Sequence, residues 1–161
     1  MSTQQVTIRK MPAATLYGIS HVGPYEAIAP VFGKLAKIAE TEKVSYDSGV
    51  YIGLYYDNPD TNPPAQLRSK ACFMPHKPET KLVDPAISTY QFHEGEYAVY
   101  LYKGAYEGLP NAWRWFFETW FPTSGRQFIL NDQNPTFELY LNECGKVANE
   151  ELLTELMLRL K

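Results

Sequence analysis

Short apolar and β-branched segments predict that strands make up most of this chain. The first strand is expected at residues 6–8 and the second at residues 16–22, and we expect these two to pair across a turn that contains Pro12. Further strands are predicted at residues 50–56, 67–74 and 135–142. The Asp-Asn-Pro-Asp turn at residues 57–60 and the prolines elsewhere separate the segments, which is typical of antiparallel sheets.

Two apolar stripes with helical spacing predict two main helices. The first stripe consists of Phe32, Leu35, Ala36 and Ala39, and the second of Trp113, Phe116, Phe117 and Trp120. Each recurs at i, i+3, i+4 and i+7, which marks one face of a helix. Pro30 and Pro110 fall where the helices should begin, in a first turn that needs no proline N–H. Trp115 lies off the second stripe and is expected to be a lone surface aromatic.

The second half of the chain repeats the first. With a shift of 81 residues, the Gly-Pro-Tyr-Glu of residues 23–26 falls on the Gly-Ala-Tyr-Glu of residues 104–107, and the first apolar stripe falls on the second. Beyond the helices the best shift becomes 84, which makes Leu54 the counterpart of Glu138. The two halves therefore share one plan of strands around a helix.

This repeat predicts the fold class. We expect a single α+β domain over residues 1–161, built from duplicated strand-helix-strand-strand repeats at about 4–76 and 85–161. The repeats should pack about a pseudo-twofold axis and form an antiparallel sheet of about eight strands with two main helices. Residues 152–160 stay open: the repeat predicts a strand there, whereas their Glu and Leu content favours a helix.

Composition and charge exclude several classes of function. The net charge is −3 and the 15 basic residues are scattered, so we expect no direct nucleic-acid binding and no attraction to an anionic membrane. No stretch resembles a leader or a membrane span, which predicts a soluble, cytoplasmic protein. Aromatic residues make up 14% of the chain, an excess that suits a site for flat apolar ligands.

The cysteines and histidines suggest neither a disulfide framework nor a metal site. Cys72 and Cys144 are expected to be buried free thiols, because two cysteines without a CxxC spacing form no known framework. Cys72 and His76 lie four residues apart, but Pro75 intervenes and no second ligand pair is present. We therefore expect no metal and no other cofactor.

Glu138 is the strongest candidate for a functional residue. It is a single carboxylate among Phe137, Leu139, Tyr140 and Leu141. Strand alternation alone would allow Glu138 to face solvent. Its apolar counterpart in the repeat instead favours a buried position, and a buried carboxylate is costly unless it serves a purpose. We therefore predict that Glu138 lies at the floor of a pocket.

Several ordered segments together resemble one known family. They are residues 23–26, the Tyr-Tyr-Asp-Asn-Pro-Asp of 55–60 with Pro63 and Leu67-Arg68, and the Phe-Glu-Leu-Tyr-Leu-Asn of 137–142. This set is similar to the GyrI-like family of small-molecule-binding domains, in particular to the DNA gyrase inhibitor proteins of the SbmC type. The resemblance covers nearly the whole chain.

The resemblance implies a ligand and a set of site residues. In drug-binding members, a buried glutamate of the second repeat attracts lipophilic cations, and Glu138 matches it. The aromatic residues carried over beside it are Phe32 and Tyr51, and the internal repeat adds Tyr102 and Trp113. The expected partner is thus a small aromatic or cationic ligand, and the gyrase-inhibitor members imply DNA gyrase as a second candidate partner.

Three functions are compatible with these observations. The first is binding of a cationic, apolar compound around Glu138, and the second is docking on DNA gyrase to modulate it. The third follows from members of the family that hydrolyse strained electrophilic rings, in which case Glu138 would be the catalytic acid or base. The sequence shows no His, Ser or Lys paired with Glu138, so a binding protein is favoured over an enzyme.

Overall fold

The computed structural model describes residues 5–161, which divide into two compact units. One unit comprises residues 12–94, and the other comprises residues 5–11 together with Gly95–Lys161. Each unit contains four antiparallel strands and one main helical segment, so the described residues form an α+β fold with eight strands and two main helices. This confirms the fold class that the sequence predicts. No helix in the described part of the chain is long and apolar enough to cross a membrane.

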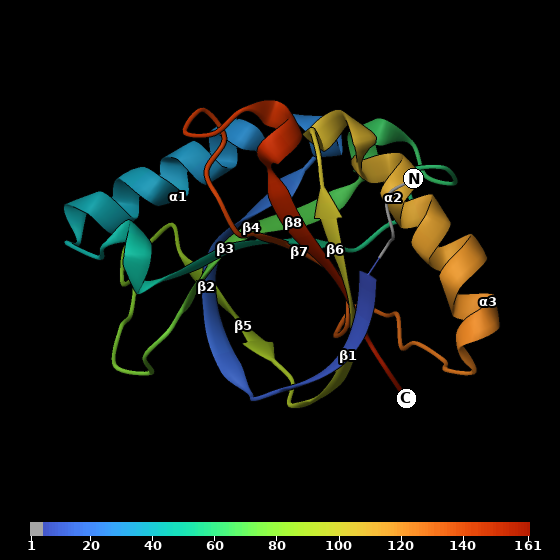
Figure 1. Ribbon diagram of the computed structural model, residues 1–161. Coiled ribbons are helices and arrows are strands. Elements are labelled where there is room, and N and C mark those ends of the chain that lie inside the picture. The colour runs from blue at the N-terminus through green and yellow to red at the C-terminus, as the bar shows by residue number, and fades with distance from the viewer. Residues whose placement is uncertain (1–4) are drawn as a thin grey trace. The chain divides into compact units, whose positions relative to one another are not determined.

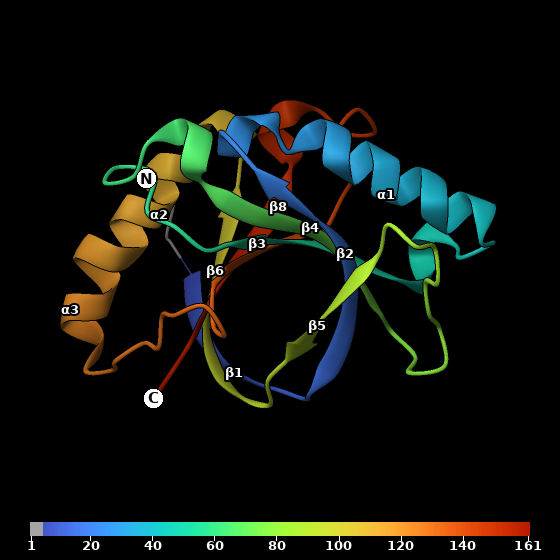
Figure 2. The same cartoon turned by 180° about the vertical axis from the view of Figure 1, so that it is seen from behind.

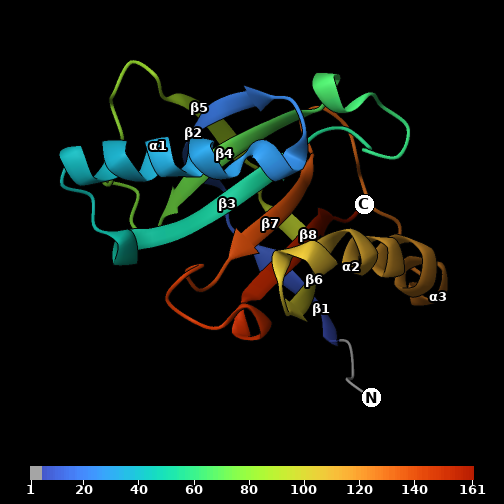
Figure 3. The ribbon, with the colours of Figure 1, turned by 90° about the horizontal axis from the view of Figure 1, so that it is seen from above.

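The unit of residues 12–94 is a four-stranded sheet with α1 on one face. Its elements are β2 (Ala14–Val22), α1 (Ala29–Thr41), β3 (Gly49–Tyr55), β4 (Arg68–Pro75) and β5 (Ser88–Phe92). The strands follow the order β3-β4-β2-β5. α1 packs across β4 and β2 (Figure 3), and the short β5 lies beside β2 (Figure 2). Pro30 lies in the first turn of α1, as predicted.

The other unit has the same plan. Its elements are β1 (Gln5–Met11), β6 (Gly95–Lys103), α2 (Leu109–Trp115), the π-helical turn η5 (Phe116–Trp120), α3 (Phe121–Ser124), β7 (Thr136–Tyr140) and β8 (Leu153–Arg159). The strand order is β1-β6-β8-β7. The segments α2, η5 and α3 follow one another as a single orange helical stretch (Figure 1). β8 resolves the open question about residues 152–160 in favour of the strand.

The predicted pairing of the first two strands is wrong. β1 pairs with β6, in register from Gln5 opposite Leu101 to Met11 opposite Gly95, whereas β2 pairs with β4 and β5. The closeness of the two strands in sequence suggested a hairpin. Instead, β1 pairs with β6 although β2 follows it in the chain. In the same way, β5 pairs with β2 although β6 follows it in the chain.

Hydrogen bonds show that the repeat offset after the helices is 85 residues, not the 84 predicted. Gly23 N donates to Leu67 O, and Gly104 N donates to Leu152 O. Likewise Tyr56 N donates to Arg68 O, and Leu141 N donates to Leu153 O. An offset error of one residue exchanges the two faces of a strand. The structural counterpart of Glu138 is therefore Gly53, and Leu54 lies on the opposite face.

The corrected offset also pairs Asp57 with Asn142. Each of these side chains accepts a hydrogen bond from the first backbone N–H of the following strand. Asp57 Oδ2 accepts from Arg68 N at 2.8 Å, and Asn142 Oδ1 accepts from Leu153 N at 2.9 Å. Asp57 also accepts from the Arg68 guanidinium at 2.8 and 3.1 Å. The side-chain hydrogen bond from Arg68 is the main reason that the pKa of Asp57 lies below its ordinary value.

We expect Asp57→Asn to reduce the amount by which the free energy of unfolding falls between pH 7 and acid. Because the folded-state pKa of Asp57 is lowered, its pairing with Arg68 stabilises the fold above about pH 4 and is lost as pH falls through the folded-state value. The variant should lose about 1 kcal/mol or less at pH 7, as for a partly exposed pair. Denaturant titrations at pH 7 and in acid check this, and a stability difference that stays constant with pH would contradict it.

The core of the unit that contains residues 95–161 lies between β6, β8 and the helical stretch. Its buried members are Ala98, Tyr100, Leu109, Ala112, Phe116, Phe121, Leu156, Leu158 and Leu160. Trp115 packs against this core with its ring centroid 4.9 Å from that of Tyr100, so the prediction of a lone surface aromatic is wrong. The buried face is centred on Ala112 and Phe116, and Trp115 flanks it on one side as Trp113 does on the other.

Buried and exposed positions differ from the prediction at two further residues. Cys72 is buried, and burial raises the pKa of its thiol to about 12, but Cys144 is exposed. Ala36 is exposed, because α1 turns Leu35 and Ala39 toward the sheet and Ala36 lies to the side of that line. The sequence pattern around Cys144 and Ala36 contains no signal that these side chains are exposed.

Candidate ligand-binding site

Strand β7 places Glu138 on the face of its sheet that carries the helical stretch. Glu138 lies opposite Leu156 of β8, which belongs to the core packed against α2. Its neighbours Phe137 and Leu139 are buried on the other face, as strand alternation requires. Glu138 itself is only 7% exposed. The carboxylate is therefore a buried group among aromatic and aliphatic side chains, as predicted.

Two aromatic side chains donate hydrogen bonds to this carboxylate. Trp113 Nε1 of α2 lies 2.7 Å from Glu138 Oε2, and the Tyr140 hydroxyl lies 2.8 Å from Glu138 Oε1. Such bonds to a charged acceptor offset much of the cost of removing it from water. Both donors are uncharged side chains, and these two bonds hold and orient the carboxylate.

Further aromatic rings surround the two donors. Tyr106 meets Tyr140 edge to face with centroids 5.7 Å apart, and Phe117 stacks on Trp113 at 5.7 Å. Together with Glu138, the residues Trp113, Tyr140, Tyr106 and Phe117 form what we call the Glu138 cluster. It presents a carboxylate together with the faces and edges of four rings.

Tyr102, which the repeat places in the predicted site, serves the turn beside it. Its hydroxyl donates to Ala105 O at 2.7 Å, and burial followed by the charge of Glu107 raises its pKa. Gly108 allows this arrangement, because a Cβ there would lie 2.1 Å from the Tyr102 hydroxyl. Tyr102 lies on the same face of the sheet as Tyr140, and Thr154 of β8 stands between them.

We expect Tyr140→Phe to test the buried hydrogen bond directly. The change removes one donor to a buried carboxylate and should lower the free energy of unfolding by about 1–3 kcal/mol. Denaturant titration gives this value. Tyr46→Phe is a suitable control because Tyr46 is 43% exposed, and it should change stability by less than about 0.5 kcal/mol. Equal effects of the two variants would contradict a stabilising role for the Tyr140 hydroxyl.

The first repeat lacks a carboxylate at the equivalent position. Gly53 replaces Glu138, and Tyr55 replaces Tyr140. The Tyr55 ring covers the glycine, since a Cβ at Gly53 would lie 2.6 Å from the Tyr55 hydroxyl. The duplication therefore yields one carboxylate cluster per chain.

The remaining predicted site residues, Phe32 and Tyr51, belong to the unit of residues 12–94. They contact each other edge to face at 6.4 Å, and Tyr51 also stacks on Tyr46 at 5.3 Å. Phe32 holds the position in α1 that Trp113 holds in α2. A ligand-binding role for Phe32 and Tyr51 stays a prediction.

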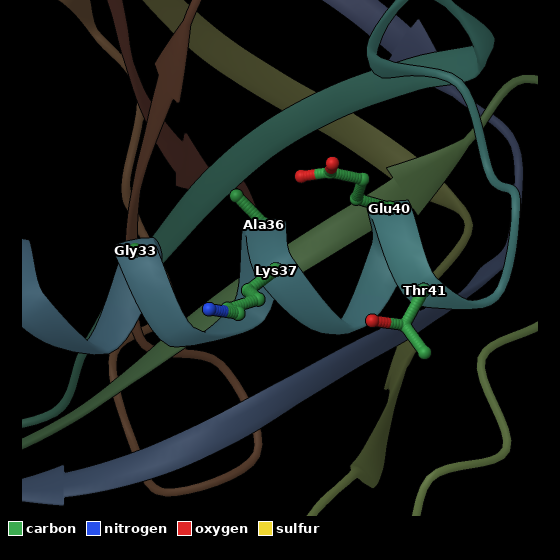
Figure 4. Close-up of a pocket in the computed structure, with 5 residues that line it drawn as sticks. All are labelled: Gly33, Ala36, Lys37, Glu40 and Thr41. Carbon is green, nitrogen blue, oxygen red and sulfur yellow. The ribbon is translucent and has the colours of Figure 1, made fainter.

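Two surface hollows lie along α1, and no residue of the Glu138 cluster lines either of them. One has a volume of about 450 Å³ and is bordered by Gly33, Ala36, Lys37, Glu40 and Thr41 (Figure 4). In that view Ala36 and Glu40 project from one side of the helix and Thr41 from the other. The second, of about 470 Å³, extends from Ala36 to Tyr46 and Tyr51. Neither combines a buried charged group with an aromatic enclosure.

Sequence reasoning missed Tyr140 and Tyr106. Tyr140 follows Glu138 by two residues and so shares its face of the strand, a signal that alternation already contains. Tyr106 repeats Tyr25, which meets Tyr55 edge to face at 4.9 Å just as Tyr106 meets Tyr140. The offset of 81 already pairs Tyr25 with Tyr106, and the correct offset of 85 would have paired Tyr55 with Tyr140.

Comparisons with known proteins agree with this fold. The model of the GyrI-like small molecule binding domain matches residues 4–161. A DNA gyrase inhibitor of Yersinia enterocolitica is 28% identical over 141 residues, covering 84% of this chain and 85% of the relative.

Two solved structures share the fold at low sequence identity. An EcmrR–DNA complex superposes with a TM-score of 0.76 at 15% identity, covering 98% of this chain and 57% of that one. SAV2435 bound to tetraphenylphosphonium superposes with a TM-score of 0.61 at 14% identity, covering 98% and 94%. The family model spans nearly the whole chain, and the protein therefore belongs to the family of GyrI-like small molecule binding domains.

Proposed function

We propose that the protein binds lipophilic organic cations at the Glu138 cluster. The observation that carries this proposal is the buried carboxylate held between an indole N–H and a phenol O–H. A cation that reaches it gains a charge interaction in a site of low polarity, where such interactions are stronger than in water. Each ring face adds cation–π attraction of about 0.5–2 kcal/mol.

The proposal also explains why the carboxylate is retained. Burial of Glu138 costs stability that an apolar residue would not, and the first repeat shows that Gly53 is accommodated at the same position. A preorganised carboxylate recovers this cost when a ligand of opposite charge binds. The bound tetraphenylphosphonium of SAV2435 supplies a probe of the right chemistry, a single positive charge surrounded by aromatic rings.

Calorimetric titration with tetraphenylphosphonium tests the proposal. We expect saturable binding with one ligand per chain, because only one repeat carries the carboxylate. Tryptophan emission should change in parallel, since Trp113 is hydrogen-bonded to Glu138. Absence of saturable binding up to millimolar ligand would refute the proposal.

A second candidate function is modulation of DNA gyrase. It is favoured by the Yersinia relative, which matches most of both chains and is named a DNA gyrase inhibitor. A supercoiling assay with purified gyrase tests it, with inhibition rising with the molar ratio of this protein as the expected result. Supercoiling unchanged at a large molar excess would count against this function and would leave cation binding unaffected.

A further inference from the structure

Thr154 carries a buried hydroxyl that the protein itself does not satisfy. The residue is fully buried on β8, and its Oγ1 has no hydrogen-bond partner among the residues that the structure describes. Buried polar groups in native proteins are nearly always hydrogen-bonded, because an unsatisfied one costs stability. A hydroxyl in this state is available to accept a hydrogen bond from a ligand that binds next to it.

The strand register places this hydroxyl beside the Glu138 cluster. Thr154 lies directly opposite Tyr140 on β7 and opposite Tyr102 on β6, so all three side chains share one face of the sheet. Tyr140 donates its hydroxyl hydrogen to Glu138, and Tyr102 donates its own to Ala105. Neither tyrosine hydrogen is therefore directed to Thr154.

We propose that Thr154 is a second polar anchor of the Glu138 site and that it selects ligands whose cation carries N–H groups, namely aromatic primary or secondary ammonium compounds. This inference rests on the proposed cation-binding function and names its ligand class. One N–H donates to the Glu138 carboxylate and another to Thr154 Oγ1. Quaternary cations satisfy the carboxylate alone.

The geometry of the strands supports a ligand of this size. Glu138 is the diagonal neighbour of Thr154 across β7 and β8, a relationship that separates the backbones by about 7–8 Å. The two N–H groups of one ammonium nitrogen reach acceptors about 5 Å apart. The longer glutamate side chain covers the remaining distance.

The first repeat provides a matched control. Ser69 is the counterpart of Thr154 at the offset of 85, it is only 2% exposed, and its Oγ also lacks a partner among the described residues. Yet the position equivalent to Glu138 there is Gly53. A hydroxyl without a neighbouring carboxylate cannot form the two-point contact, so Ser69 should have no influence on ammonium binding.

The experiment compares diphenylmethylammonium with its N,N,N-trimethyl counterpart in calorimetric titrations of the parent, Thr154→Val and Ser69→Ala. We expect Thr154→Val to weaken binding of the primary ammonium by about five- to tenfold and to change binding of the quaternary compound by less than about twofold. Ser69→Ala should change neither affinity. The unfolding temperature of unliganded Thr154→Val should equal or exceed that of the parent, because the buried hydroxyl is gone.

Three results in the variants would overturn the inference. They are an equal loss of affinity for both compounds in Thr154→Val, unchanged affinity for both in Thr154→Val, or the same selective loss in Ser69→Ala. A parent protein that binds the quaternary compound but gains nothing from N–H groups would also overturn it while the proposed function stands. A parent that binds neither compound would refute the proposed function itself.

Discussion

Glu138→Gln should weaken tetraphenylphosphonium binding by about 30-fold or more. The amide keeps the size of the side chain and can still accept from Trp113 Nε1, so the fold should persist. What disappears is the negative charge, and loss of one partner from a buried charge pair costs about 2–5 kcal/mol of binding. Calorimetry of the two proteins at equal ionic strength measures the difference.

Glu155→Gln is the matched control for this variant. Glu155 is another buried glutamate of the same unit, 8% exposed, but it pairs with the Arg9 guanidinium through both carboxylate oxygens. It also lies on the face of β8 opposite to Leu156 and the core. The control should lower stability through the broken ion pair and leave ligand affinity unchanged. Equal loss of affinity in both variants would show that any negative charge in this unit favours cation binding, and that Glu138 has no specific role in it.

Phe116→Ala should be strongly destabilising. Phe116 is fully buried and contacts the rings of Tyr100, Trp113, Trp120 and Phe121. Truncating such a phenylalanine typically costs about 3–5 kcal/mol, since transfer energy is lost and a cavity remains. Denaturant titration of the variant measures this loss.

Phe117→Ala provides the comparison on the neighbouring position. Phe117 is only partly buried, although it stacks on Trp113 and on Phe121 at 6.3 Å. Its loss should cost about 1–2 kcal/mol less than that of Phe116, in proportion to the apolar area removed. A larger effect of Phe117→Ala would place the centre of the core on the Trp113 side of the helix, contrary to the packing described.

The sequence was sufficient for the fold class because the two halves repeat the same signals. The glycine-led turns at Gly23 and Gly104, the opening prolines and the apolar stripes each occur twice, which defined the elements and their order. The repeat even predicted β8 against the helical propensity of its residues. Tertiary pairing overrides such propensity in a buried central strand.

The burial of Glu138 was predicted correctly for a reason that proved wrong. An offset of 84 made the buried Leu54 its counterpart, whereas the structure pairs it with Gly53. The four extra residues in the connection after the helix cannot be placed from sequence, because loops tolerate insertions wherever backbone is exposed. Hydrogen bonds between strands fix the register, and they involve backbone groups that the residue pattern does not reveal.

The cluster around Glu138 could be predicted only in part. Trp113 could be predicted because it belongs to the apolar stripe of the second helix. In the structure its indole N–H donates to the Glu138 carboxylate. The unsatisfied hydroxyl of Thr154 could not be inferred, since burial of a threonine and absence of a partner are properties of the packed structure. The pairing of β1 with β6 was hidden by the same limitation, as long-range pairs leave no local signal.

The central claim is that the charge of Glu138 recognises the charge of the ligand. The most direct test removes the charge of the residue and the charge of the ligand, separately and together. Parent and Glu138→Gln are each titrated with tetraphenylphosphonium and with neutral triphenylphosphine oxide. We predict that the variant loses about 30-fold or more in affinity for the cation and less than about threefold for the neutral compound. Equal losses for both ligands would contradict the claim, because they would show that Glu138 shapes the site without reading charge.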